Sequence, residues 1–213
     1  DFVLRRGQTT AIIGNTGSGK STIAKLLLRF HDVTSGGVRV GGTDVRDQTQ
    51  DALRAQIAYV PQKAWLFSGT IAQNLRHGRA DATDEGQGGS NFSGGQRQRL
   101  AIARALVRHV GLYVFDDSFS ALDFRTDAAL RRALAPELAD AATLVIAQRV
   151  STIRDADQIV VLSEGRVVGL GTHDELMRTC PTYKEIADSQ AGEESKTMTS
   201  KREETRERDA LLA

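Results

Sequence analysis

The chain has 213 residues, a formal net charge of +1 and one cysteine. This length suits one sizeable core with appendages, and the nearly balanced charge gives no electrostatic case for nucleic acid or an anionic membrane surface as the main partner. A single cysteine excludes an internal disulfide, and no apolar run approaches the roughly 18 residues of a membrane-spanning helix.

Strands and a helix are predicted on either side of the first glycine-rich segment. Residues 1–4 alternate like a strand and turn at 5–7, and this abrupt start indicates that an upstream part of the domain is missing. The run Thr-Ala-Ile-Ile at 10–13 predicts a short buried strand. The segment after the glycines predicts a helix whose apolar face is made by Ile23, Leu26, Leu27 and Phe30.

The glycine-rich segment itself, residues 14–21, fits the phosphate-binding pattern G-x-x-x-x-G-K-[ST]. Its spacing leaves backbone N–H groups free to surround phosphate oxygens, and the helix N-terminus adds its positive dipole end. Lys20 is expected to reach the β- and γ-phosphates, and the Ser21 hydroxyl to bind Mg²⁺. The predicted nucleotide contacts of this segment are Gly14, Asn15, Thr16, Gly17, Ser18, Gly19, Lys20, Ser21 and Thr22.

The next stretch predicts a small β-hairpin and then a strand. Glycine turns before residues 38–40 and between 40 and 43 indicate an antiparallel hairpin over 38–45. Residues 51–56 can form one or two helical turns, and 57–60 predict a strand that Pro61 stops. Gln62 therefore stands at the C-terminal end of a strand, which is where ligands bind in open α/β sheets.

An apolar cluster follows at residues 65–71 and has two interpretations. The segment is either part of the core or an exposed docking surface, and composition alone favours the core. Further on, Ser93, Gly94 and Gly95 precede a helical pattern that runs to Leu106. Ser93 is a good N-cap, and two glycines allow close approach of an anion to the helix N-terminus, although any helix can start in this way.

Carboxylates and an amide end the later strands. Residues 112–117 predict a buried strand ending in Asp116 and Asp117, where a phosphate-loop protein places a Mg²⁺ partner and an acid that positions water. A loop at 120–123 leads to a helix from Arg125 to Leu134, with a break at Pro136. The strand 143–147 ends at Gln148, 158–168 predict a closing hairpin, and a charged, solvated tail begins at about residue 191.

These motifs, in this order, resemble the nucleotide-binding domain of ATP-binding cassette transporters up to about Ser189. The resemblance rests on five motifs, and the segment 61–71 together with 88–91 is similar to the exporter branch. They are the phosphate loop 14–21, Gln62, the signature segment 92–99, the pair Asp116 and Asp117, and the loop 120–123.

The resemblance implies an α/β fold with a phosphate-loop ATPase core, a mixed, mostly parallel sheet flanked by helices, and an antiparallel β subdomain. ATP and Mg²⁺ are the implied cofactors, held by Lys20, Ser21, Gln62 and Asp116. In a head-to-tail dimer, Ser93, Gly94, Gly95 and Gln96 would face the nucleotide of a second cassette domain. Transmembrane domains would dock near 62–71, which favours the docking interpretation of that segment and places the domain on the cytoplasmic face of the cell membrane.

Two residues depart from the family pattern at the reaction centre. Glutamate is usual at Asp117 and histidine at Gln148. The shorter aspartate would draw the carboxylate back from the attacking water by about 1 Å, a displacement that can cost on the order of 10²-fold. Gln148 can donate a hydrogen bond to the γ-phosphate but cannot relay a proton, and one lost transition-state contact costs roughly 10²–10³-fold. We therefore expect a site that binds ATP and hydrolyses it poorly.

The signature is nearly intact, with Phe92 in place of the usual leucine, and this asymmetry resembles the degenerate half of a heterodimeric multidrug-type exporter. The expected catalytic residues are accordingly Asp117, Gln148 and Gln62. A homodimer with two slow sites, and an active ATPase in which Asp117 suffices, remain alternatives within the family. A soluble cassette ATPase acting on DNA or ribosomes is disfavoured, because no basic face or long coiled-coil insertion is visible.

The family also predicts the domain limits. Residues 1–189 form the cassette domain with incomplete N-terminal strands, and 190–213 form a charged tail that is disordered or a marginal helix. The interval between Gln62 and Ser93 is too short for the helical subdomain that the family inserts there, and residues 84–88 look like a splice across it. Either the helical subdomain is deleted in this protein, or it exists and the numbering used here closes over the gap that it leaves. The aromatic residue that usually stacks on adenine is also missing.

Overall fold

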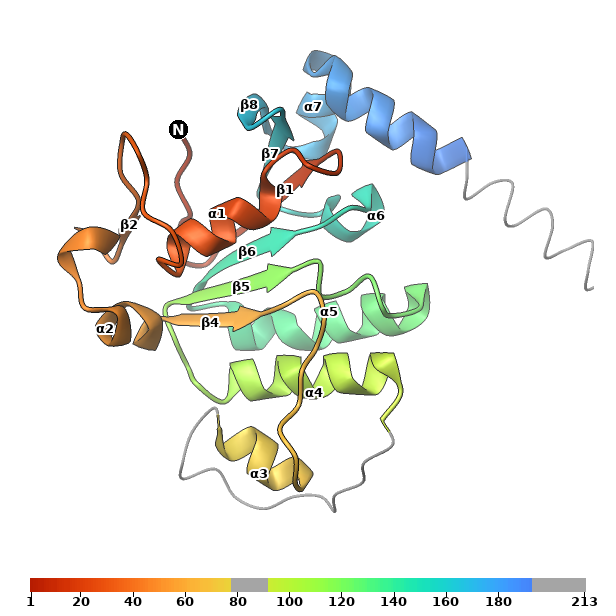
Figure 1. Ribbon diagram of the computed structural model, residues 1–213. Coiled ribbons are helices and arrows are strands. Elements are labelled where there is room, and N and C mark those ends of the chain that lie inside the picture. The colour runs from red at the N-terminus through yellow and green to blue at the C-terminus, as the bar shows by residue number, and fades with distance from the viewer. Residues whose placement is uncertain (78–91, 193–213) are drawn as a thin grey trace, which may run out of the picture.

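The computed structural model describes residues 1–77 and 92–192, and its centre is a six-stranded sheet (Figure 1). The strand order is β4-β5-β6-β1-β7-β8, and every neighbouring pair is parallel except β7 and β8. The strands are β1 (Thr9–Gly14), β4 (Ile57–Val60), β5 (Leu112–Asp116), β6 (Ala142–Ile146), β7 (Gln158–Ser163) and β8 (Arg166–Gly171). This confirms the predicted α/β class with a mostly parallel sheet.

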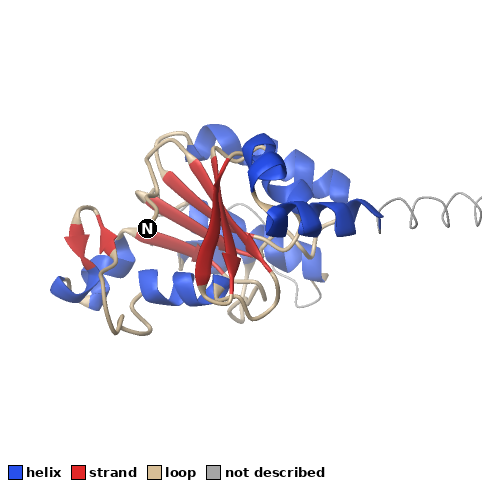
Figure 2. Cartoon of the chain, turned by 90° about the horizontal axis from the view of Figure 1, so that it is seen from above, coloured by secondary structure: helices blue, strands red, loops and turns tan. Residues whose placement is uncertain are grey.

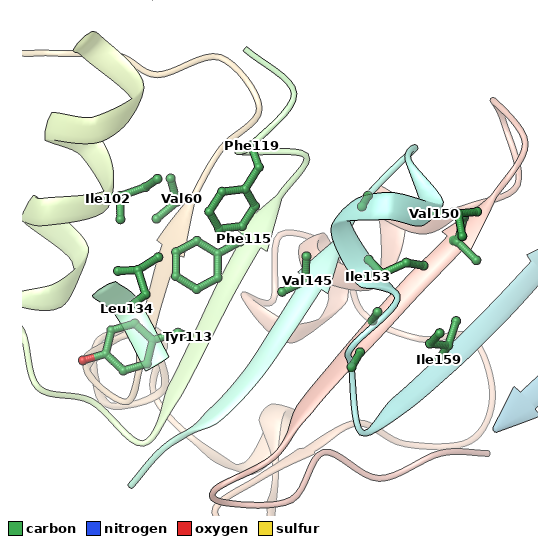
Figure 3. Close-up of a cluster of buried hydrophobic side chains, with 14 of the residues drawn as sticks. Val60, Ile102, Tyr113, Phe115, Phe119, Leu134, Val145, Val150, Ile153 and Ile159 are labelled. Carbon is green, nitrogen blue, oxygen red and sulfur yellow. The ribbon is translucent and has the colours of Figure 1, made fainter. Parts of the chain in front are cut away.

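The central strands are buried on both faces, which explains why the sequence shows them as continuous apolar runs. Successive side chains of a strand point to opposite faces, so Ala11 and Ile13 belong to one core cluster and Ile12 to another. Figure 3 shows the first cluster, in which the rings of Tyr113 and Phe115 from β5 lie beside Leu134. The second cluster contains Ala24 and Leu27 of α1.

Helices cover the sheet, and a separate small hairpin lies at one end of it (Figure 2). The hairpin pairs β2 (Arg39–Val40) with β3 (Thr43–Asp44) in antiparallel register, as predicted. The helices are α1 (Lys20–Leu27), the 3₁₀ turn η1 (Val45–Asp47), α2 (Gln50–Ala55), α3 (Ile71–Arg76), α4 (Gly94–Leu106), α5 (Phe124–Leu138), α6 (Val150–Ile153), α7 (His173–Thr179) and a last helix over 181–192. None of the helices in the described residues combines the length and apolar composition that a membrane crossing requires.

Three local predictions are wrong: the strand at 1–4, the place of Phe30 on a helix and the helix break at Pro136. Residues 1–4 form no strand; Phe2 and Leu4 pack against the second core cluster as irregular chain. Phe30 lies outside α1 and is 54% exposed, because Arg29 has a φ of 52° and turns the chain away after Leu27. Its ring instead lies under the guanidinium of Arg54, 4.9 Å from the ring centroid.

Pro136 does not break its helix, since α5 continues to Leu138. A proline removes the hydrogen bond to the carbonyl four residues earlier and crowds that carbonyl. Pro136 lies in the last turn, so the disturbance is confined to the helix end. The predicted splice at 84–88 and residues 193–213 of the charged tail lie outside the described residues, while 190–192 end the last helix.

Candidate functional site

The phosphate-loop segment connects β1 to α1 with backbone that only glycine adopts easily. Gly19 is the N-cap of α1 and has a φ of 97°, in the left-handed region that favours glycine. A Cβ at Gly14 would collide with the carbonyl oxygen of Leu162 and lie 2.7 Å from Ser18 Oγ. The N-terminus of α1 has no side-chain cap, so its first amides remain available to an anion.

Two side chains of this loop fit a phosphate group. Lys20 is half-buried and its Nζ donates to the carbonyl oxygens of Gly14 and Asn15, at 2.6 and 2.9 Å. Burial lowers the pKa of Lys20, while the charges of Asp117 and Asp116 oppose that shift. Ser18 Oγ is buried and has no hydrogen-bond partner in the described part of the chain. An unsatisfied buried hydroxyl in the same loop as an ammonium group suits a bound anion.

The predicted Mg²⁺ partners Ser21 and Asp116 are in contact. Ser21 Oγ donates to Asp116 Oδ1 at 3.1 Å, and the Tyr59 hydroxyl donates to Asp116 Oδ2 at 3.0 Å. Within residues 1–77 and 92–192, no group of three or more His, Cys, Asp or Glu side chains could hold a metal by itself. That finding is compatible with Mg²⁺, which usually keeps waters and takes few protein ligands beside substrate phosphates.

Asp117 joins the ends of three strands. Gln62, beyond the end of β4, donates from Nε2 to Asp117 Oδ2 at 2.8 Å. Gln148, beyond the end of β6, donates from Nε2 to the same oxygen at 2.9 Å. The three predicted catalytic side chains are therefore in one hydrogen-bonded group at the carboxyl ends of the strands, where α/β sheets bind ligands.

Burial is the main influence on Asp117. It raises the pKa of the Asp117 carboxyl, the hydrogen bond from Gln62 lowers it, and the neighbouring charge of Asp116 raises it further. The backbone of Asp117 has a φ of 49°, a conformation that aspartate tolerates better than most residues. Its N–H donates to the carbonyl oxygen of Ile146 at 2.7 Å, which ties the turn after β5 to the end of β6.

Sequence reasoning missed the residues that support this group. Ser118 is buried and its Oγ donates to the Val60 carbonyl at 2.7 Å, while Gln98 of α4 donates to the Pro61 carbonyl at 3.2 Å. Tyr59 was missed as well; burial, followed by the charge of Asp116, raises its pKa above the ordinary value. A signal existed for Gln98, which shares the helical face of the buried residues Ala101, Ile102 and Ala105.

The signature segment begins α4 as predicted. Ser93 is the N-cap and forms a capping box, because its Oγ accepts from the Gln96 N–H at 3.2 Å and Gln96 Oε1 accepts from the Ser93 N–H at 2.8 Å. Ser93 and Gly94 are exposed, and a Cβ at Gly95 would contact the Leu122 side chain at 3.4 Å. The helix N-terminus is thus open to a ligand or partner.

The segment 62–71 presents aromatic side chains at the surface. Trp65 is 61% and Phe67 is 37% exposed, with ring centroids 4.4 Å apart, so neither belongs to the core. Phe67 also stacks on His77 at 3.9 Å. Arg104 of α4 lies over the Phe67 ring at 5.4 Å and donates to the Trp65 carbonyl at 3.1 Å. The patch is held against α4, which Figure 1 shows beside α3.

Comparison with known proteins places these features in a family. The family model described as ABC transporter matches residues 1–120. An uncharacterized ABC transporter ATP-binding protein of Mycobacterium tuberculosis is 48% identical over 217 residues, covering 89% of this chain and 37% of the relative. The multidrug efflux ATP-binding/permease protein of the same organism is 41% identical over 209 residues, covering 86% of this chain and 18% of the relative.

A solved structure is similar over the same extent. The bacterial Atm1-family ABC exporter with ATP bound has a TM-score of 0.83 and 37% sequence identity to this chain, covering 89% of it and 38% of the exporter chain. This chain therefore spans well under half the length of these proteins. The alignment with the uncharacterized mycobacterial relative spans 217 positions but covers only 89% of the 213 residues of this chain. It therefore contains gaps in this chain, and part of that relative has no counterpart here.

Proposed function

The chain belongs to the ABC transporter family, and we propose that it is the ATP-binding domain of an exporter, whose transmembrane domains dock on Trp65 and Phe67 at the cytoplasmic face of a membrane. The observation that carries this proposal is the convergence of Lys20, Asp116 and Asp117 at the carboxyl ends of the strands. The likeness to an exporter structure with ATP bound supports it.

The phosphate-loop residues fit MgATP. Lys20 would exchange the carbonyl oxygens of its own loop for phosphate oxygens, and Ser18 Oγ would gain the partner that it lacks within the described chain. Ser21 and Asp116 would hold Mg²⁺, which neutralises charge on the phosphates when it is bound. Gln62 would leave Asp117 and complete the metal site through its amide oxygen, which is an acceptable Mg²⁺ ligand.

We propose that hydrolysis at this site is slow. Asp117 is shorter than the glutamate usual in the family, and its Oδ2 already accepts from Gln62 and Gln148. These two amide donors already occupy the lone pairs of that oxygen, so it is less available to accept a proton from water. Gln148 replaces the usual histidine and has no proton to relay. The chain's own site therefore binds ATP well and turns it over poorly.

The signature segment of this chain would serve a second cassette domain. Ser93 and Gly94 are exposed at the N-terminus of α4, and their amides and hydroxyl can reach a γ-phosphate held by the partner. A non-identical partner with its own glutamate and histidine would make one competent site in the dimer. Two copies of this chain would instead make two slow sites.

We also propose that the helical subdomain is shortened in this chain. Within the alignment, part of the mycobacterial relative has no counterpart in this chain. The interval between Gln62 and Ser93 is where the family inserts that subdomain. Trp65 and Phe67 lie near the start of that interval, where Arg104 of α4 holds them.

The test is ATP hydrolysis with Mg²⁺ by the full transporter, with single substitutions confined to this chain. Ser93→Ala should abolish turnover while Lys20→Ala merely slows it, because the competent site then lies on the partner and uses this chain's signature. Thr172→Ala removes an equivalent capping box from α7 and controls for the loss of a cap. Equal loss in Ser93→Ala and Lys20→Ala would show that Asp117 works as a base and that this chain's own site is active.

A further inference from the structure

The last helix reaches back to the loop that carries Gln148. Gln190 is half-buried in the helix 181–192, and both ends of its side-chain amide are used. Its Oε1 accepts from the Val150 N–H at 2.8 Å, and its Nε2 donates to the Gln148 carbonyl at 2.7 Å. Two hydrogen bonds to backbone groups two residues apart fix the position and the orientation of that loop.

The loop needs this support because its helix has no cap of its own. Val150 is the first residue of the four-residue helix α6, and its N-cap Arg149 makes no side-chain capping bond. The first N–H groups of a helix lack partners within the helix. Gln190 supplies one for Val150 from a distant part of the sequence, in the role that an N-cap side chain usually has.

The helix that carries Gln190 is anchored independently of it. Tyr183 is fully buried, and Ile186 and Ala187 pack against the first core cluster. Removal of the Gln190 amide therefore leaves the helix in place and frees only the loop. On the other side of that loop, the Gln148 side chain donates to Asp117, so two hydrogen bonds through Gln148 connect Gln190 to the reaction centre.

We propose that Gln190 is a positioning residue for the nucleotide site, which holds the backbone of Gln148 so that its amide faces the γ-phosphate. The inference rests on the proposed function. It makes the last helix part of the ATP site without contact to the nucleotide. The loss of Gln190 should weaken binding of a triphosphate more than binding of a diphosphate, because only the triphosphate reaches Gln148.

The experiment measures binding of mant-ATP and mant-ADP, each with Mg²⁺, to the 213-residue chain. Gln190→Ala should lower the ratio of ATP to ADP affinity by about 3- to 10-fold, the range expected for one hydrogen bond. Gln148→Ala should lower it similarly, and the double variant should lose nothing more. Ser189→Ala, an exposed neighbour in the same helix, should leave the ratio unchanged.

Hydrogen exchange at the Val150 amide separates positioning from structural support. Gln190→Glu keeps the acceptor for Val150 but loses the donor to Gln148, so it should lower the affinity ratio while that amide stays protected. The Gln190→Glu variant also tests the inference if Gln190→Ala fails to fold. An unchanged ratio in both variants, or a wild type without preference for ATP over ADP, would overturn the inference alone. A wild type that binds neither nucleotide would overturn the proposed function and the inference with it.

Discussion

Asp116 and Asp117 are neighbours at the end of β5, yet their carboxylates meet different donors. Each carboxylate oxygen of Asp116 accepts a hydrogen bond from a hydroxyl group, one from Ser21 and one from Tyr59. One carboxylate oxygen of Asp117 accepts two hydrogen bonds from side-chain amides, one from Gln62 and one from Gln148. A hydroxyl can rotate and turn a lone pair toward a metal ion, whereas an amide N–H₂ offers only donors at that end.

This difference separates the proposed metal-holding half of the site from the proposed water-activating half. The Asp116 half, with Lys20 and Ser21, fits the phosphate-loop pattern in every residue. The Asp117 half departs from the family at both Asp117 and Gln148. In the function proposed above, the first half binds MgATP and the second is poorly suited to proton transfer.

The largest effect is expected from breaking the metal-holding half. Lys20→Ala removes the ammonium group that we place on the β- and γ-phosphates, and loss of charge-assisted hydrogen bonds of about 1.5–3 kcal/mol each should weaken MgATP binding by roughly 10²-fold. Titration with mant-ATP measures it. Lys25→Ala, an exposed lysine of the same helix, is the control and should bind normally. Normal binding by Lys20→Ala would contradict the assignment of the loop.

The next effect tests whether the water-activating half can be restored. Asp117→Glu with Gln148→His should raise ATP turnover at this chain's own site by roughly 10²-fold, since both the carboxylate reach and the proton relay return. The measurement is turnover in the assembled transporter whose partner site is inactivated. No gain would count against a degenerate site. Because glutamate tolerates the left-handed backbone at 117 less well, the variant should also lose about 1 kcal/mol of stability.

The sequence predicted the parts of this comparison that depend on local spacing. Residues 14–21 and Ser93 are set by contacts within a few positions, and the apolar runs at 10–13 and 112–116 follow from burial on both faces of the sheet. Tyr59, Gln98 and Gln190 escaped prediction because each contacts residues far away in the sequence. Pro136 was misread because its effect depends on its distance from the helix end, which spacing alone does not give.

Acid titration should distinguish the carboxylates by their effect on stability. Burial raises the pKa of Asp117 above its unfolded value, so its contribution to folding is present in acid below that value and is lost as the pH rises through the folded pKa. Asp117→Asn should therefore raise the melting temperature at pH 7 by a few degrees and lose this advantage below about pH 4. Thermal denaturation across that range measures it.

Asp44 provides the opposite case for comparison. Its hydrogen bonds with Arg46 lower its pKa to about 2, so its contribution is present above the unfolded value and is lost as the pH falls toward 2. Asp44→Asn should leave the acid end unchanged and lower the melting temperature slightly at pH 7. If Asp117→Asn behaved like Asp44→Asn, burial would not be the main influence on Asp117.

The smallest effect is expected from removing the Tyr59 hydroxyl, which donates a hydrogen bond to Asp116. Tyr59→Phe removes the donor to Asp116 Oδ2 and should cost about 0.5–1.5 kcal/mol of unfolding free energy, the net value of one hydrogen bond. It should also weaken the dependence of ATP binding on Mg²⁺ by less than about tenfold. Denaturant titration and mant-ATP binding at varied Mg²⁺ measure both.

Tyr113→Phe is the matched control for this last effect. Tyr113 is buried in the neighbouring strand. Among the residues that the structure describes, its hydroxyl makes only long contacts, 3.4 Å to the Val110 N–H and 3.5 Å to the Leu106 carbonyl. Its loss should change stability less than Tyr59→Phe does and should leave the Mg²⁺ dependence unchanged. If both variants shifted the Mg²⁺ dependence equally, the shift would come from the core of the sheet, and the hydroxyl of Tyr59 would have no specific role in holding Asp116.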